Sequence, residues 1–172
     1  MKRKNLLITT SILILGIFIF ILFSNRALNS NLESVIQDDK RNEGFVGSLH
    51  YEYLVNYNSL VFSLDDVSYD YTIADVFRVF LQVADEMKDK DFTRFTFSYK
   101  GNKKFYIDGK YFKTLGKEYS IQNPLYTMRV FPSYLYKMDK TKAYSSLGGL
   151  ISDYVDFTDF HENWYYDDMQ NE

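Results

Sequence analysis

The sequence of 172 residues contains no cysteine, only two prolines and only eight glycines. Without cysteine, the chain can form no disulfide bond, no Cys-ligated zinc or iron–sulfur site and no thiol nucleophile. Proline and glycine together are about half as frequent as in average proteins, which excludes collagen-like and linker-like chains. Because 46% of the residues are hydrophobic and 25% are charged, we expect a folded protein with one ordinary domain.

Each end of the chain lacks charges of one sign. Residues 1–26 carry four basic residues and no acid, residues 27–142 carry 16 of each, and residues 143–172 carry seven acids without Lys or Arg. A nucleic-acid-binding protein needs a basic face on its folded part, because it must neutralise phosphates. The charge distribution therefore predicts no nucleic-acid partner.

One long apolar stretch, Leu6–Phe23, contains no charged residue. As a helix it would be about 27 Å long, close to the roughly 30 Å hydrocarbon core of a bilayer. We interpret it as a transmembrane signal-anchor. A cleaved secretory signal is the main alternative, although the stretch is longer than a usual signal core and residues 23–27 offer no convincing small-x-small cleavage site. A buried core helix is the third interpretation.

The flanking charges predict how this segment is oriented. Three basic residues precede the apolar stretch at positions 2–4, and one arginine follows it closely. By the positive-inside rule, residues 1–5 form a short cytoplasmic tail and the rest of the chain is exported, to the periplasm or cell surface if the host is a bacterium. We expect residues 24–47 to form a juxtamembrane stalk and residues 48–172 to form an extracytoplasmic domain.

The stalk has the apolar spacing of a helix. Leu28, Leu32, Val35 and Ile36 recur at helical intervals, and a polar cluster at 37–44 interrupts the pattern. Such a helix can continue from the membrane segment, lie on the membrane surface or pack in the domain core.

Alternating apolar residues predict two antiparallel hairpins. The first joins strands at 49–55 and 60–64, and the second joins strands at 94–99 and 104–107. Between the hairpins, Thr72-x-x-Asp75 has the spacing of a capping box, and it opens an amphipathic helix that extends to Met87.

The remaining elements follow from caps and prolines. Asp108 is expected to cap a helix with Gly116 as its stop signal, and the segment between Pro124 and Pro132 is expected to be an edge or terminal strand. A last helix should run from about Leu150 to Tyr165, with one apolar face made of Leu150, Tyr154, Phe157, Phe160, His161 and Trp164. The predicted fold class is α+β: an antiparallel sheet of about five strands, packed by two main amphipathic helices and preceded by one N-terminal transmembrane helix.

The sequence contains few candidates for catalysis. His161 is interpreted as a hydrogen-bonded core or interface histidine, with a catalytic or ligand role as the alternative, and His50 as an exposed strand residue. No G-x-S-x-G or S-x-x-K motif frames a serine. The acids at 153, 156, 159 and 162 spread along a helix instead of converging as calcium ligands do. We therefore assign no catalytic residue, metal or cofactor.

Two charged segments are candidates for an interaction surface. Residues 94–117 contain seven bases and one acid, which suits either a solvated rim that pairs with the acidic tail or a patch for an anionic partner. The C-terminal segment sets aromatic residues among carboxylates, a composition suited to docking on a basic partner. The candidate residues are Lys100, Lys103, Lys104, Asp156, Asp159, Glu162, Trp164 and Tyr166.

Together these features favour a non-enzymatic, single-pass membrane protein whose outer domain binds a protein partner. Such a protein could be an accessory subunit of an envelope complex or an immunity-type protein. The alternatives are an envelope hydrolase that acts on wall sugar or peptide, which needs two carboxylates or His161 beside a hydroxyl in one pocket, and a domain that senses a small ligand. The oligomeric state stays open.

Overall fold

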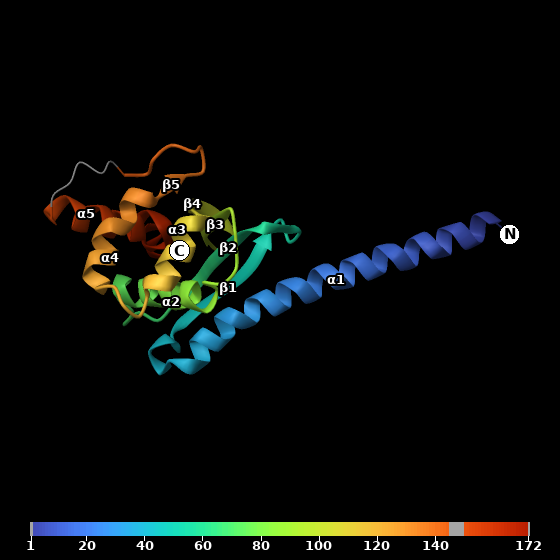
Figure 1. The fold of residues 1–172 in the computed structure, drawn as a ribbon, viewed down its shortest axis with the longest axis horizontal. Helices are drawn as coiled ribbons and strands as arrows, with labels where there is room; N and C mark the ends of the chain where they lie inside the picture. Colours follow the sequence, from blue (N-terminus) through green and yellow to red (C-terminus); the bar gives the residue numbers. More distant parts are fainter. Residues whose placement is uncertain (1, 145–149, 172) are drawn as a thin grey trace.

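Helix α1 (Lys2–Asp38) is a single uninterrupted helix that projects from the rest of the molecule (Figure 1). In this computed structural model, residues 2–144 and 150–171 are described, so Met1 of the expected cytoplasmic tail lies outside the described residues. The helix is long and apolar enough to span a membrane, and its apolar window is exposed throughout. Further along the same helix, Leu28, Leu32 and Val35 are buried in the core of the domain. The helix thus continues from the apolar stretch and packs as a core helix.

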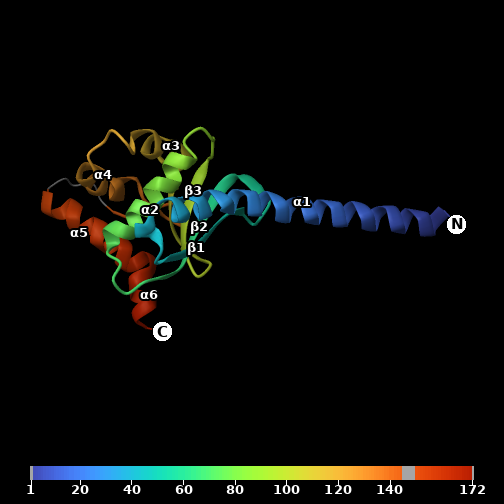
Figure 2. The ribbon, with the colours of Figure 1, turned by 90° about the horizontal axis from the view of Figure 1, so that it is seen from below.

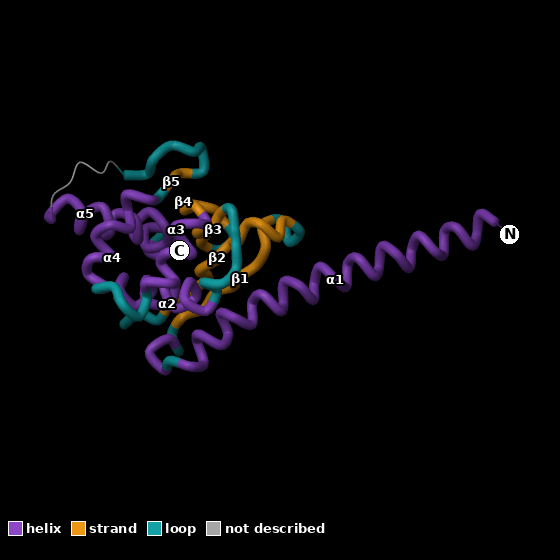
Figure 3. The backbone as a smooth tube through the Cα atoms, viewed as in Figure 1, coloured by secondary structure: helices purple, strands orange, loops and turns teal. Residues whose placement is uncertain are grey.

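Five strands form one sheet in the order β1-β2-β3-β4-β5, drawn in orange in Figure 3. Both predicted hairpin pairings are confirmed, because β1 pairs antiparallel with β2 and β3 pairs antiparallel with β4. The first turn, however, lies at 53–55, inside the strand predicted at 49–55, and residues 56–59 belong to β2. The expectation of a wholly antiparallel sheet is wrong: β2 and β3 are parallel, since helix α2 crosses between them. The strands are β1 (Phe45–Glu52), β2 (Asn56–Val67), β3 (Arg94–Tyr99), β4 (Asn102–Asp108) and β5 (Tyr136–Lys137).

Helices α2 (Ile73–Glu86) and α3 (Gly109–Glu118) begin as the sequence predicts. The capping box of α2 is present, with Thr72 Oγ1 accepting from the Asp75 backbone N–H and the Asp75 carboxylate accepting from the Thr72 N–H. Asp108 caps α3 by accepting from the Lys110 N–H at 2.8 Å. Gly116, however, lies inside α3 and does not end it. A Cβ there would lie 2.1 Å from the Ala84 carbonyl oxygen, so this glycine lets α3 approach α2 closely.

The predicted strand between the two prolines is instead helix α4 (Pro124–Val130), followed by the 3₁₀ turn η2 (Phe131–Tyr134). The Asn123 side chain caps α4 by accepting from the Leu125 N–H at 2.9 Å. Pro124 occupies the first turn, where a missing N–H leaves no helical hydrogen bond unmade. The strand prediction was wrong because these two local signals outweigh the alternation of the segment.

The C-terminal helix is interrupted by one wider turn. It consists of α5 (Leu150–His161), the π-helical turn η3 (Glu162–Tyr166) and α6 (Asp167–Gln170). Phe157, Phe160 and Trp164 are buried, as their predicted face requires, but Tyr154 is 64% exposed. The described residues form α4 and α6 in addition to the two main helices expected, α2 and α5, and the helix that Asp108 predicts, α3.

Aromatic rings fill the space between the sheet and the helices, which are arranged as Figure 2 shows. Phe80 of α2 lies at the centre of this core, in contact with rings from β2, β3, α3 and η2. Trp164 is fully buried, and its Nε1 donates to the Ser98 carbonyl at 2.9 Å. Each such ring pair adds roughly 0.5–1.5 kcal/mol beyond the burial of its area. Much of the high aromatic content is therefore explained by packing.

Helix α1 also covers the outer edge of strand β1. The Asn29 side chain accepts from the Leu49 N–H at 2.8 Å, and the Asn25 side chain accepts from the Tyr51 N–H at 2.9 Å. The spacings match, because four residues of helix and two residues of strand each span about 6–7 Å. Two edge N–H groups that would otherwise need water are thus satisfied by the helix.

We predict that replacing both asparagines, Asn25→Ala and Asn29→Ala, lowers the free energy of unfolding by about 2 kcal/mol, since each lost hydrogen bond costs about 1 kcal/mol. Urea unfolding of the full chain in detergent, followed by the fluorescence of Trp164, measures this change, because Trp164 is the only tryptophan. Asn31→Ala is the matched control, since the Asn31 side chain bonds only within its own helix. A double variant as stable as this control would contradict the role of the α1–β1 seam, by which we mean the contact of Asn25 and Asn29 with the edge of β1.

Candidate interaction surface around helix α4

Helix α4 lies on the surface without a single buried residue, although most of its side chains are apolar. Leu125 is 69% exposed and Tyr126 is 52% exposed. Ile121, in the turn before α4, is exposed as well, as are Tyr154 and Val155 of α5. We call this set, Ile121, Leu125, Tyr126, Tyr154 and Val155, the α4 surface. Leu125 and Tyr154 line one common cavity, and contiguous exposed apolar side chains are characteristic of a protein contact site.

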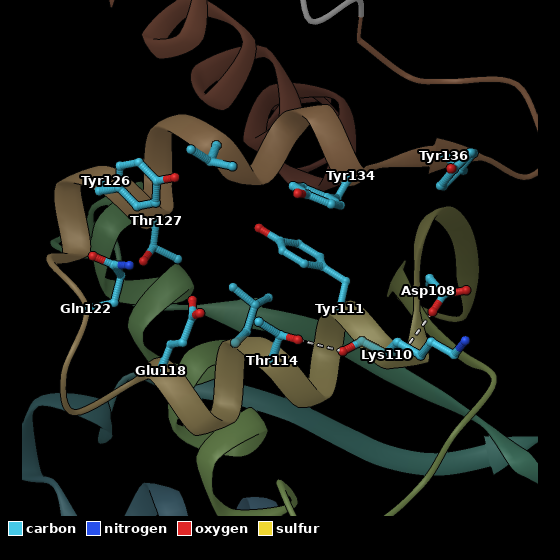
Figure 4. A pocket seen from close by; sticks show the side chains of 12 residues that line it. Asp108, Lys110, Tyr111, Thr114, Glu118, Gln122, Tyr126, Thr127, Tyr134 and Tyr136 are labelled. Atoms are coloured by element: carbon cyan, nitrogen blue, oxygen red, sulfur yellow. Dashed lines mark hydrogen bonds between the residues drawn. The ribbon is translucent and has the colours of Figure 1, made fainter.

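Cavities flank α4 on its inner sides. A groove of about 550 Å³ separates it from α3 (Figure 4), a cavity of about 280 Å³ lies where α2, α3 and α4 meet, and a third of about 210 Å³ lies between α4 and α5. Leu125 and Tyr154 both line the third cavity, so they belong to one continuous surface. The helix therefore has space beside several of its side chains.

Four tyrosines, Tyr111, Tyr126, Tyr134 and Tyr136, line the groove. Tyr111 of α3 stacks on Tyr134 of η2, with ring centroids 3.7 Å apart. Figure 4 shows the hydroxyls of Tyr111 and Tyr126 and the Glu118 carboxylate directed into the space between the helices. Burial, with smaller contributions from Tyr134 and Glu118, raises the pKa of Tyr111 far above its usual value, so its hydroxyl stays neutral. Among the described residues, the Glu118 carboxylate has no hydrogen-bond or ion-pair partner.

The carboxylates of the groove are not arranged for paired acid–base chemistry. Asp108 caps α3, and Glu118 lies ten residues further along that helix, so the two are separated by about 15 Å along the axis. Glycoside hydrolases need roughly 5–10 Å between their carboxyls. Within the described part of the chain, no group of three or more His, Asp or Glu residues could hold a metal ion. The two carboxylates of the groove are therefore too far apart along α3 for paired acid–base chemistry.

The acids predicted on the last helix lie along α5 and η3. Asp153 forms an ion pair with Arg129 of α4 at 3.1 Å. Burial, and then repulsion by Asp159 and Asp153, raises the pKa of Asp156. In residues 2–144 and 150–171, neither Asp156 nor Asp159 has an ion-pair partner, and Glu162 is exposed. A cation from another molecule would relieve this repulsion.

The other predicted site residues lie elsewhere. Lys103 pairs with Glu52 at 2.6 Å, Lys104 pairs with Asp168 at 2.7 Å, and the Lys100 ammonium lies 5.3 Å from the centre of the Tyr99 ring. Lys103 and Lys104 are thus bound to acids of the same chain. Trp164 is in the core and does not contribute to a surface, whereas Tyr166 is 47% exposed.

His161 is fully buried among aromatic rings, and both its ring nitrogens lack a hydrogen-bond partner. The expected hydrogen bond is therefore absent, because its neighbours are Phe77, Phe157, Phe160, Trp164 and Tyr165. Burial lowers its pKa to about 3. None of the cavities described above is lined by His161. The other histidine, His50, is half-buried rather than exposed, with Nδ1 3.0 Å from the Tyr51 carbonyl.

The α4 surface and the tyrosine groove are the features that sequence reasoning missed. Both depend on residues 124–130 being helical, and the sequence was interpreted there as a strand. The signal that could have found them is Asn123-Pro124, because Asn before Pro is a typical start of a helix.

No protein-family model matches this chain, and no curated protein or solved structure matches it either. Its function is therefore inferred from the geometry just described.

We predict that His161 makes the domain less stable in acid. The pKa of His161 is lowered in the folded state, so well above pH 6.5 its imidazole is neutral in both the folded and the unfolded chain. Below pH 6.5 the imidazole is protonated in the unfolded chain, but in the folded chain it stays neutral down to about pH 3. Its contribution to stability should therefore fall by about 2 kcal/mol between pH 7.5 and pH 5. The free energies of unfolding of the native protein and of His161→Phe, each measured at both pH values, give this change. Equal losses in the two proteins would contradict this prediction.

Proposed function

We propose that this protein is a single-pass membrane protein whose extracytoplasmic domain binds a protein partner on the α4 surface. In this proposal α1 is the anchor, the domain does not catalyse a reaction, and the partner contributes basic and apolar side chains. An accessory subunit of an envelope complex and an immunity-type protein both fit this description.

Two features of α1 support the anchor. None of the apolar window of the helix is buried, and among the described residues only the β1–β2 hairpin contacts its end, at Phe20. Signal cleavage after Ala27 would remove Asn25, which donates to the Leu54 carbonyl and accepts from the Tyr51 N–H. The domain thus uses the helix up to the end of the apolar stretch, which favours an uncleaved anchor over a cleaved signal.

The observation that carries the binding role is the exposure of α4. A helix is normally stabilised by burying its apolar side, and α4 buries none of its residues fully. Tyrosine and leucine side chains at such a position would gain burial when a partner covers them. The unpaired carboxylates of Glu118, Asp156 and Asp159 favour a partner with basic groups.

The position of the α4 surface suits this role. In Figure 1, α4 and α5 lie at the end of the domain opposite the projecting part of α1. If that part of α1 is in the membrane, the α4 surface faces away from the lipid. A partner in the extracytoplasmic space could therefore reach it without contacting the bilayer.

We predict that a photo-crosslinking amino acid at Leu125 forms an adduct with one protein in native membranes. The matched control is Val46 of β1, which is exposed to a similar degree, at 55% against 69%. Asp156→Asn together with Asp159→Asn should reduce the adduct at Leu125 by about tenfold, because the charge complementarity is lost. Urea unfolding of each variant checks that the fold is retained.

The comparison between positions decides the outcome. An adduct at Leu125 that is absent at Val46 and weakened by the two asparagine substitutions supports the proposed site. Equal labelling at both positions, or an adduct that the substitutions leave unchanged, contradicts it.

A further inference from the structure

The turn between β1 and β2 presents large apolar side chains to the outside. Tyr53 is 77% exposed, Leu54 46% and Val55 51%. Tyr53 and Leu54 both have positive φ, at 53° and 64°, a conformation that hairpin turns normally assign to Asn or Gly. The turn itself therefore does not favour these residues, so their side chains point to a contact outside the domain.

This turn lies beside α1 at the level where the apolar stretch ends. The Asn25 side chain donates to the Leu54 carbonyl at 2.8 Å, and the rings of Tyr57 and Phe20 are 6.4 Å apart. Phe20 lies three residues, or about 4.5 Å, before the last apolar residue, Phe23. Figures 1 and 2 both show the teal turn reaching toward the projecting part of α1. In a helix that spans the bilayer, this level is the lipid–water interface, where tyrosine is enriched.

A crevice of about 440 Å³ separates α1 from the hairpin at the same level. Its lining combines aromatic rings, among them Phe20, Phe23 and Tyr57, with one basic residue, Lys90. Lys90 is exposed, and among the described residues its ammonium has no ion-pair partner. An apolar crevice with one cation beside it matches a phospholipid, which has acyl chains and a phosphate.

A partly buried ion pair holds the turn in this position. Lys103 Nζ lies 2.6 Å from the Glu52 carboxylate and 4.2 Å from the centre of the Tyr53 ring. Glu52 is nearly buried, so the pair is shielded from solvent. Lys103 thus supports the exposed ring instead of binding a separate partner.

We propose that the β1–β2 turn, residues 53–55, together with Tyr57 of β2 and the crevice beside it, forms a second membrane contact that binds the phospholipid interface. This inference rests on the anchor in the proposed function. The contact fixes the domain against the bilayer at one end and leaves the α4 surface at the other end free.

The test uses the full chain in vesicles of phosphatidylcholine and phosphatidylglycerol at about 3:1. Because the sequence has no cysteine, Leu54→Cys can be labelled uniquely with an environment-sensitive fluorophore. Val55→Cys repeats the measurement at a position without positive φ. Phe18→Cys reports on the apolar stretch. Tyr69→Cys is the exposed control, since its loop is tied to the 3₁₀ turn after α1 (η1, Lys40–Asn42) by the Tyr71 hydroxyl, which donates to the Arg41 carbonyl.

At positions 54 and 55 we expect quenching by headgroup spin-labelled lipid and an aqueous iodide quenching constant about threefold or more below that at position 69. Suppose that spin-labelled lipid quenches the fluorophore at position 18, but iodide quenches the fluorophores at positions 54 and 55 as strongly as that at position 69. The second contact is then overturned and the anchor stands. If position 18 is not quenched by lipid, both are overturned. Shielding of 54 from iodide without lipid quenching also overturns the proposal, because a second copy or another protein then covers the turn.

Discussion

The seam between helix α1 and strand β1 is the interaction on which the arrangement of the molecule depends. One continuous helix supplies the exposed apolar stretch and, further along, the buried side chains of Leu28, Leu32 and Val35. Asn25 and Asn29 join that helix to the edge of the sheet through backbone N–H groups. Because no flexible linker separates the two parts, the direction of the apolar helix sets the orientation of the domain. An edge strand that could pair with other chains is covered by the same contact.

The interior of the domain and the region around α4 differ in how well they are packed. Rings from the sheet, α2 and the C-terminal helix surround Phe80 and Trp164, and His161 remains neutral among them without a hydrogen bond. By contrast, α4 is bordered by cavities and leaves Leu125 and Tyr126 in solvent. A well-packed core can support one loosely packed helix at its surface, and such a helix is able to adapt to a partner. This contrast is the physical basis of the proposed binding role.

Local signals in the sequence predicted much of the fold, and the errors occurred where tertiary context decides. The capping box at Thr72, the cap at Asp108 and the two hairpins were predicted from residues close in sequence, and the structure confirms them. The parallel pairing of β2 with β3 depends on a crossover that periodicity does not report. Gly116 was interpreted as a stop signal because its contact with Ala84 is invisible in the sequence. The candidate surface was missed for the same kind of reason, since exposure of Leu125 depends on which neighbours fail to cover it.

The central claim is that α1 spans the membrane and holds the domain outside the cytoplasm. The most direct measurement is the labelling of a single cysteine, Tyr69→Cys, with a membrane-impermeant maleimide in spheroplasts, since Tyr69 is fully exposed and the native sequence lacks cysteine. The account predicts equal labelling before and after permeabilisation, in protein that stays in the membrane pellet. Labelling only after permeabilisation, or label recovered in the soluble fraction, would contradict it.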